Sequence, residues 1–91
     1  MKIFKYPIIV EDSFTLKMPE GARPLCVQIQ HGVPWIWAAV DPMEPDVDHV
    51  FHVCGTGHER NEISVEQYIG TFQLASGGLV FHVFDGGEPV L

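Results

Sequence analysis

Short runs of alternating apolar and polar residues, separated by turn residues, make up most of this 91-residue chain. An amphipathic helix would repeat apolar residues at positions i, i+3, i+4 and i+7, and no segment sustains that spacing. Alternation with a period of two places apolar side chains on one face of a β-strand. The pattern therefore predicts an all-β protein.

Seven short strands are predicted. They lie at residues 2–10, 14–18, 24–30, 33–40, 50–54, 68–74 and 79–84. Pro7 indicates a sheet edge or a bulge in the first strand, because proline cannot donate a hydrogen bond to a strand ladder. About seven short strands with closely spaced turns are typical of a small antiparallel sandwich or a partly open barrel. The pattern leaves both architectures open.

Turn residues separate these strands. The His31-Gly32 pair predicts a tight turn, and the run Ala75-Ser76-Gly77-Gly78 predicts the turn of the last hairpin, because glycine readily adopts positive φ angles. Residues 61–67 form at most one helical turn, in which Ser64 and Gln67 have the spacing of a capping box.

The strand predicted at residues 33–40 is apolar on both faces. One face carries Trp35, Trp37 and Ala39, and the other carries Ile36, Ala38 and Val40. Strands that are covered on both sides have such continuous apolar runs. We therefore interpret Trp35 and Trp37 as core residues. The alternative is an aromatic surface that stacks a nucleobase.

Length and composition predict a single domain spanning residues 1–91, because a chain of this size with 46% hydrophobic residues can bury one modest core. No apolar run reaches the roughly 18 residues of a membrane-spanning helix, and the N-terminus lacks the apolar segment of a signal peptide. The expected compartment is therefore the cytoplasm. There, Cys26 and Cys54 are expected to be buried free thiols.

The chain is acidic, with a net charge of −7. Residues 1–23 carry +1, whereas residues 24–91 carry −8, because nine carboxylates there face a single Arg60. So few cations cannot neutralise several phosphates, which argues against binding duplex nucleic acid. The densest acidic run contains Asp41, Glu44, Asp46 and Asp48. It predicts either a solvated loop or an interface with a basic protein, since spaced carboxylates can mimic a phosphate backbone.

The run Gly55-Thr56-Gly57-His58 directly follows the strand predicted at residues 50–54. Glycines at a strand end can leave backbone amides bare, and bare amides can cradle an anion. Charge-assisted donors from His58 and Arg60 would add to these amides, and Tyr68 could stack a base. The candidate nucleotide site therefore consists of Gly55, Thr56, Gly57, His58, Arg60 and Tyr68. A plain turn is the competing interpretation.

A zinc site is a weaker alternative, in which His52, Cys54 and His58 supply three ligands. The competing interpretation is that His49, His52 and His82, each flanked by Val or Phe, are hydrogen-bonded to neighbouring strands. Catalytic motifs such as Gly-x-Ser-x-Gly, paired His-x-Thr/Ser and the phosphate-binding loop are absent from the sequence. We therefore expect a binding protein without a cofactor, and not an enzyme.

Six blocks, taken in order, carry a family resemblance. They are Lys5-Tyr6, Met18-Pro19-Glu20-Gly21-Ala22, Trp37-Ala38-Ala39-Val40-Asp41-Pro42, Gly55-Thr56-Gly57-His58, Tyr68-Ile69-Gly70-Thr71-Phe72 and Leu79-Val80-Phe81-His82-Val83-Phe84. Together they span nearly the whole chain, which resembles small proteins of unknown function from tailed phages and prophages of Gram-negative bacteria. The resemblance implies an accessory phage gene product, and many such proteins counter host defences.

The expected function is therefore sequestration of a nucleotide-type immune signal of the host. The alternatives are an acidic inhibitor of a host defence complex, such as a CRISPR or other nuclease system, and a minor structural component of the phage. A symmetric homodimer is expected, because a second copy can cover the edge strands of a small sheet.

Overall fold

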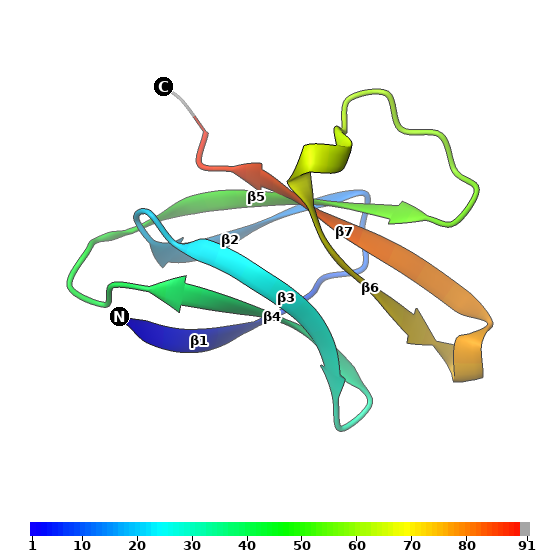
Figure 1. Ribbon diagram of the computed structural model, residues 1–91, viewed down its shortest axis with the longest axis horizontal. Helices are drawn as coiled ribbons and strands as arrows, with labels where there is room; N and C mark the ends of the chain where they lie inside the picture. Colours follow the sequence, from blue (N-terminus) through cyan, green and yellow to red (C-terminus); the bar gives the residue numbers. More distant parts are fainter. Residues whose placement is uncertain (90–91) are drawn as a thin grey trace.

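Seven antiparallel strands form two sheets in the computed structural model, which describes residues 1–89 (Figure 1). The strands are β1 (Lys2–Pro7), β2 (Ser13–Pro19), β3 (Arg23–Gln30), β4 (Val33–Val40), β5 (Asp46–Gly55), β6 (Tyr68–Leu74) and β7 (Leu79–Gly87). One sheet has the order β1-β4-β3 and the other has the order β2-β5-β7-β6. The all-β prediction is confirmed.

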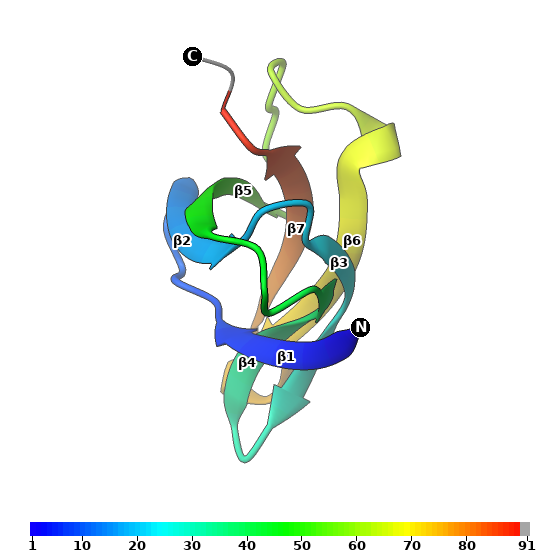
Figure 2. The same cartoon turned by 90° about the vertical axis from the view of Figure 1, so that its left-hand side faces the viewer.

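The two sheets pack face to face as a sandwich (Figure 2). Its centre consists of the fully buried side chains of Met18, Ile36, Phe51 and Val83. Within residues 1–89, strand pairing does not join the two sheets, so the barrel is not closed. The sequence pattern was compatible with either a sandwich or a barrel. The two separate sets of paired strands show that the fold is a sandwich.

The sheets approach each other most closely where β3 lies against β6 (Figure 2). Gly70 of β6 packs directly on Val27 of β3 at this contact. A Cβ atom at Gly70 would lie 3.0 Å from the Val27 Cβ and 3.2 Å from the Val27 backbone nitrogen. These distances are shorter than ordinary van der Waals contact, so a side chain at position 70 would require Val27 to shift.

Two predicted turns are confirmed. His31 and Gly32 have φ angles of 52° and 76°, which is the pair of positive angles that a two-residue hairpin turn needs. Ala75, Ser76 and Gly77, between β6 and β7, have φ angles of 53°, 55° and 90°. The turn sets the register of this hairpin, in which Leu74 pairs with Leu79.

The predicted helical turn is a 3-10 turn at Val65–Gln67 with the predicted capping box. The Ser64 hydroxyl accepts from the backbone of the turn, and the Gln67 side-chain oxygen accepts from the Ser64 N–H at 2.8 Å. The Gln67 amide also donates to the Asp85 carbonyl at 2.9 Å, which fastens the turn to β7. No helix among residues 1–89 is long and apolar enough to cross a membrane.

Three predicted strand boundaries are wrong, one of which is the end of the last strand, which lies at Gly87 and not at residue 84. The first strand ends at Pro7 and not at residue 10. β1 is an edge strand, as Pro7 had indicated. The fifth strand starts at Asp46 and not at residue 50, since Asp46 and Asp48 pair with Pro19 and Lys17 of β2. In the acidic run, Asp41 and Glu44 therefore lie in the loop before β5, whereas Asp46 and Asp48 belong to the strand.

We predict that Gly70→Ala destabilises the fold, because the added methyl group overlaps Val27 at the closest contact between the sheets. The free energy of unfolding, measured by denaturant titration, should fall by about 1–3 kcal/mol. Gln73→Ala, on the exposed side of the same strand, is the control and should change it by no more than about 0.5 kcal/mol. Equal stability of the two variants would contradict the close contact.

Candidate functional site

The Gly55–His58 loop is a β-turn. The His58 N–H donates to the Gly55 carbonyl at 3.0 Å, and the Thr56 N–H donates to the Val80 carbonyl of β7 at 3.2 Å. Gly57 has a φ angle of 85°, which explains the glycine at that position. Two of the amides that the predicted anion cradle would use are therefore already committed to backbone carbonyls.

Arg60 fastens the segment between β5 and β6 to the sandwich. Its Nη1 donates to the carbonyls of Val53 at 2.8 Å and Asp12 at 3.2 Å, and its Nε lies 2.6 Å from the Glu62 carboxylate. A backbone hydrogen bond of Glu62 and the bond from Arg60 lower the pKa of the Glu62 carboxyl. The Arg60 charge is therefore already balanced by a carboxylate.

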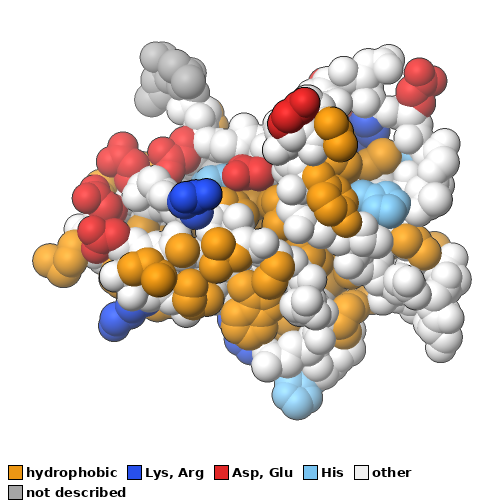
Figure 3. All heavy atoms as spheres, in the orientation of Figure 1, with side chains coloured by type: hydrophobic (Ala, Val, Ile, Leu, Met, Phe, Trp, Pro, Cys, Tyr) orange, Lys and Arg blue, Asp and Glu red, His pale blue; other side chains and the backbone are white. Residues whose placement is uncertain are grey.

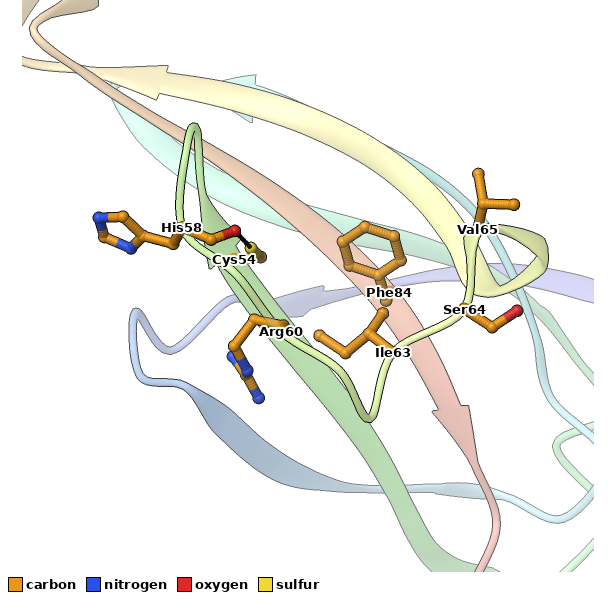
Figure 4. A pocket seen from close by; sticks show the side chains of 7 residues that line it. All are labelled: Cys54, His58, Arg60, Ile63, Ser64, Val65 and Phe84. Atoms are coloured by element: carbon orange, nitrogen blue, oxygen red, sulfur yellow. Dashed lines mark hydrogen bonds between the residues drawn. The ribbon is translucent and has the colours of Figure 1, made fainter.

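A cavity of about 220 Å³ lies beneath this segment, on the outer face of the four-stranded sheet (Figure 4). Its lining is mostly apolar and consists of Cys54, His58, Arg60, Ile63, Ser64, Val65 and Phe84. The His58 ring points away from Phe84, and the Cys54 thiol donates to the His58 carbonyl at 3.4 Å (Figure 4). The cavity suits an apolar group better than a phosphate.

A chain of hydrogen bonds lies on the same face of the sheet. His82 Nε2 is 2.7 Å from the Thr56 hydroxyl and its Nδ1 is 2.8 Å from the Thr71 hydroxyl, which in turn lies 2.6 Å from the Tyr68 hydroxyl. The Tyr68 ring meets Phe84 edge to face at 5.7 Å. The structure thus connects the predicted residues Thr56 and Tyr68 through His82 and Thr71, which the prediction of the site missed. Counting back from the hairpin turn pairs Thr71 with His82 and would have found them.

The histidines bond to neighbouring strands, as the second interpretation of them proposed. His52 Nδ1 lies 2.7 Å from the Ser13 hydroxyl of β2, and His49 Nε2 lies 2.6 Å from the Asp85 carboxylate of β7. Within residues 1–89, no three His, Cys, Asp or Glu side chains are grouped so that they could hold a metal ion. His52, Cys54 and His58 are therefore not arranged as a zinc site. Cys26 and Cys54 are free thiols, half-buried and not fully buried.

The pair of His49 and Asp85 links β5 to β7 inside the sandwich. His49 is 3% exposed and stacks on Phe51, and the Asp85 carboxylate also accepts from the Gly87 N–H at 2.8 Å. Partial burial raises the pKa of the Asp85 carboxyl, but the hydrogen bonds from His49 and Gly87 outweigh it and hold this pKa below its usual value.

The predicted acidic residues gather at one end of the molecule, at the left of Figure 3. Asp41 accepts from the Met43 N–H at 3.0 Å, and Asp48 pairs with Lys17 at 2.7 Å. A hollow of about 450 Å³ at this end is lined by Lys17, Glu20, Asp46, Val47, Asp48, Glu88 and Pro89. Lys17 is the only cation among these lining residues, so carboxylates dominate the acidic end, which we define as Glu20, Asp41, Glu44, Asp46, Asp48 and Glu88.

The interpretation of Trp35 and Trp37 as core residues is wrong. Ile36, Ala38 and Val40 are the β4 side chains that are buried between the sheets, so alternation turns both indoles to the outer face. Both rings are half-buried there, and their N–H groups have no acceptor among the described residues. Both faces of β4 are apolar in sequence, and alternation by itself does not say which one faces the partner sheet.

Strand pairing places basic side chains beside the two indoles. Lys5 of β1 pairs with Trp37, and its ammonium lies over both rings, 4.3 Å from the Trp35 centroid and 5.9 Å from the Trp37 centroid. We call this surface the Trp face. It comprises Ile3, Lys5 and Pro7 of β1, Trp35, Trp37 and Ala39 of β4, and Arg23, Cys26 and Gln28 of β3.

Charges are segregated between the two sheets. The strands β1, β3 and β4 hold Lys2, Lys5 and Arg23, which are three of the five Lys and Arg residues, and none of the twelve carboxylates. Within residues 1–89, none of these three cations has an ion pair. The Trp face is therefore a locally basic, aromatic surface on an acidic protein.

The fold and these surfaces define a small antiparallel β-sandwich domain. Its sequence matches over residues 1–90 a family described as "Domain of unknown function (DUF7352)", and the chain belongs to that family. Comparison with curated proteins gave no match, and neither did comparison with solved structures.

The lowered pKa of Asp85 makes stability depend on pH. The carboxylate contributes stability above its unfolded pKa of about 4, and this contribution is lost as pH falls through the lower pKa of the folded state. We predict that the melting temperature of the parent protein falls more steeply below about pH 4 than that of Asp85→Asn. The control Asp48→Asn removes an exposed carboxylate and should keep the parent's slope. Parallel curves for the parent and Asp85→Asn would contradict the prediction.

Proposed function

We propose that this protein acts by binding and not by catalysis, and that the Trp face binds a nucleotide-type ligand. The observation that carries this proposal is the position of two indoles beside Lys5 and Arg23, which have no ion pair within residues 1–89, in a sheet without carboxylates. A nucleotide needs an aromatic surface for its base and cations for its phosphate. Trp35 and Trp37 would supply the aromatic surface, and Lys5 and Arg23 would supply the cations.

The typical interaction energies favour stacking of a base on the indoles, although the Lys5 ammonium lies over them in the free protein. An exposed cation–π contact contributes about 0.5–1 kcal/mol. Stacking of a base on an aromatic side chain contributes about 1–3 kcal/mol. A base can therefore displace the ammonium from Trp35, and the flexible Lys5 side chain can follow the phosphate.

Our proposal moves the site away from the Gly55–His58 loop. The amides of Thr56 and His58 are committed there, and Arg60 is balanced by Glu62. The segment from β5 to β6 also carries Glu59 and Glu66, so its local charge repels phosphate. The cavity above Phe84 remains available to an apolar group.

The biological role rests on the resemblance to small phage-encoded proteins. We propose that the ligand is a nucleotide immune signal and that the protein sequesters it in the cytoplasm of the host. A binding protein of this kind needs no catalytic group and no cofactor. A homodimer, expected from the sequence, stays a prediction.

The proposal predicts binding of at least one nucleotide from a panel of mono-, cyclic di- and trinucleotides and ADP-ribose compounds, with Kd at or below about 10 μM by titration calorimetry. Trp37→Ala should weaken binding by about 5- to 150-fold, because it removes one stacking surface. His58→Ala should leave affinity unchanged. The proposal fails if no nucleotide binds, and the site returns to the loop if the order of the two variants is reversed.

A second candidate function is the blocking of a basic partner protein, which the unbalanced carboxylates of the acidic end favour. It predicts that the parent protein inhibits a purified nuclease of a host defence system. The double variant Glu20→Gln, Asp46→Asn should lose this inhibition, since it removes charges that could occupy the nuclease's basic groove. Trp37→Ala should retain it. Full inhibition by the double variant would exclude the acidic end.

A further inference from the structure

On the basis of the proposed function, we infer that the ligand of the Trp face is a short linear oligonucleotide. One of its bases stacks on Trp35 and the next stacks on Trp37. A mononucleotide would use only one of the two indoles. The inference follows from how the sheet spaces its aromatic and basic side chains, which strand pairing fixes.

The spacing of the indoles fits two bases of an extended strand. Trp35 and Trp37 occupy the same face of β4 two residues apart, which is about 6.8 Å along a strand. Successive bases in one strand of a duplex are only about 3.4 Å apart. A ligand that stacks on both indoles must therefore be unstacked and single-stranded, with one base on each ring.

The cations lie where such a strand needs them. Lys5 is within 6 Å of both ring centroids, at 4.3 Å and 5.9 Å, so a phosphate between the two bases can reach its ammonium. Arg23 pairs with Ala39, which is the next outward position of β4 beyond Trp37. Along β4 the face therefore offers two aromatic positions, with a cation beside them and a second cation at one end.

One carboxylate limits this path at the Arg23 end. Beyond Arg23 the surface continues into a hollow of about 380 Å³ lined by Met1, Gly21, Arg23, Ala39, Val40 and Asp41. Asp41 belongs to the acidic end and repels a further phosphate. The complementary surface thus accommodates about two nucleotides, because it holds two indoles and two cations.

The placement of both indoles along one strand also favours a linear ligand over a compact one. Small compact ligands are usually enclosed in cavities that bury most of their surface. The Trp face instead exposes its side chains along one direction, and both indoles come from a single strand. A linear strand can follow that direction with successive bases.

The test is quenching of the intrinsic fluorescence of the two tryptophans by defined probes. The probes are AMP, the linear dinucleotide pApA, the linear tetramer of the same nucleotide, cyclic di-AMP and tripolyphosphate. We expect pApA to bind about 5- to 150-fold more tightly than AMP, which is the gain from a second stacked base. The tetramer should bind within a few-fold of pApA, because the face holds only two indoles and two cations.

Single substitutions test which side chains of the Trp face contact the ligand. Trp35→Leu and Trp37→Leu should each abolish the advantage of pApA over AMP. For the parent protein, the slope of log K against log salt should be about −1.4, and Lys5→Gln or Arg23→Gln should each reduce its size by about 0.7. Lys17→Gln is the matched control, since Lys17 lies off the Trp face and pairs with Asp48. Melting curves confirm that each variant is folded.

The outcomes separate this inference from the proposed function. Equal affinity for AMP and pApA would overturn the inference and leave nucleotide binding intact, and so would tighter binding of cyclic di-AMP than of pApA. Binding of tripolyphosphate as tight as that of pApA would overturn stacking altogether. If none of the nucleotides quenches the tryptophans, both the inference and the proposed function on this face are wrong.

Discussion

The burial of one face of β4 is the constraint on which the other features of this protein depend. Ile36 and Ala38 are fully buried between the sheets, and sheet packing leaves about 10 Å between the two layers. The Gly70 contact with Val27 indicates how little room remains at the closest point. Because side chains alternate along a strand, placing Ile36 and Ala38 inside turns Trp35 and Trp37 outward.

The sandwich also separates charges that the linear sequence mixes. Strand pairing collects Lys2, Lys5 and Arg23 on the three-stranded sheet, while nine of the twelve carboxylates lie at the acidic end or in the segment between β5 and β6. One face of the three-stranded sheet is therefore basic and aromatic, although the net charge of the chain is −7. So few cations argue against extensive contact with duplex nucleic acid, but the net charge does not describe what a single face can bind.

The sequence was sufficient to predict the fold class, because alternation and turn residues are local signals. It predicted the hairpin of β6 and β7, the capping box at Ser64 and the hydrogen-bonded histidines. Predictions from the sequence were wrong where the outcome depended on contacts between residues that are far apart in the chain. Both faces of β4 are apolar in sequence, and only the packing against the second sheet selects the core face.

The hydrogen-bond partners of the candidate site residues could not be predicted from the sequence for a similar reason. The Gly55–His58 run suggested bare amides, but the acceptor of the Thr56 amide is Val80, and Arg60 donates to the carbonyls of Asp12 and Val53. These acceptors lie on other strands, so no local pattern reveals them. The sequence offered the indoles as a surface that could stack a base, but it did not show that Lys5 lies over them, because this contact arises only through pairing of β1 with β4.

The most direct test of this account is a comparison of iodide and caesium as quenchers of the intrinsic fluorescence of Trp35 and Trp37 in the native protein. These are the only two tryptophans, so the signal reports on the Trp face alone. Outward indoles beside Lys5 and Arg23 should be quenched more strongly by iodide than by caesium, despite the net charge of −7. Negligible quenching by both ions would place the indoles in the core, and stronger quenching by caesium would contradict the local positive charge.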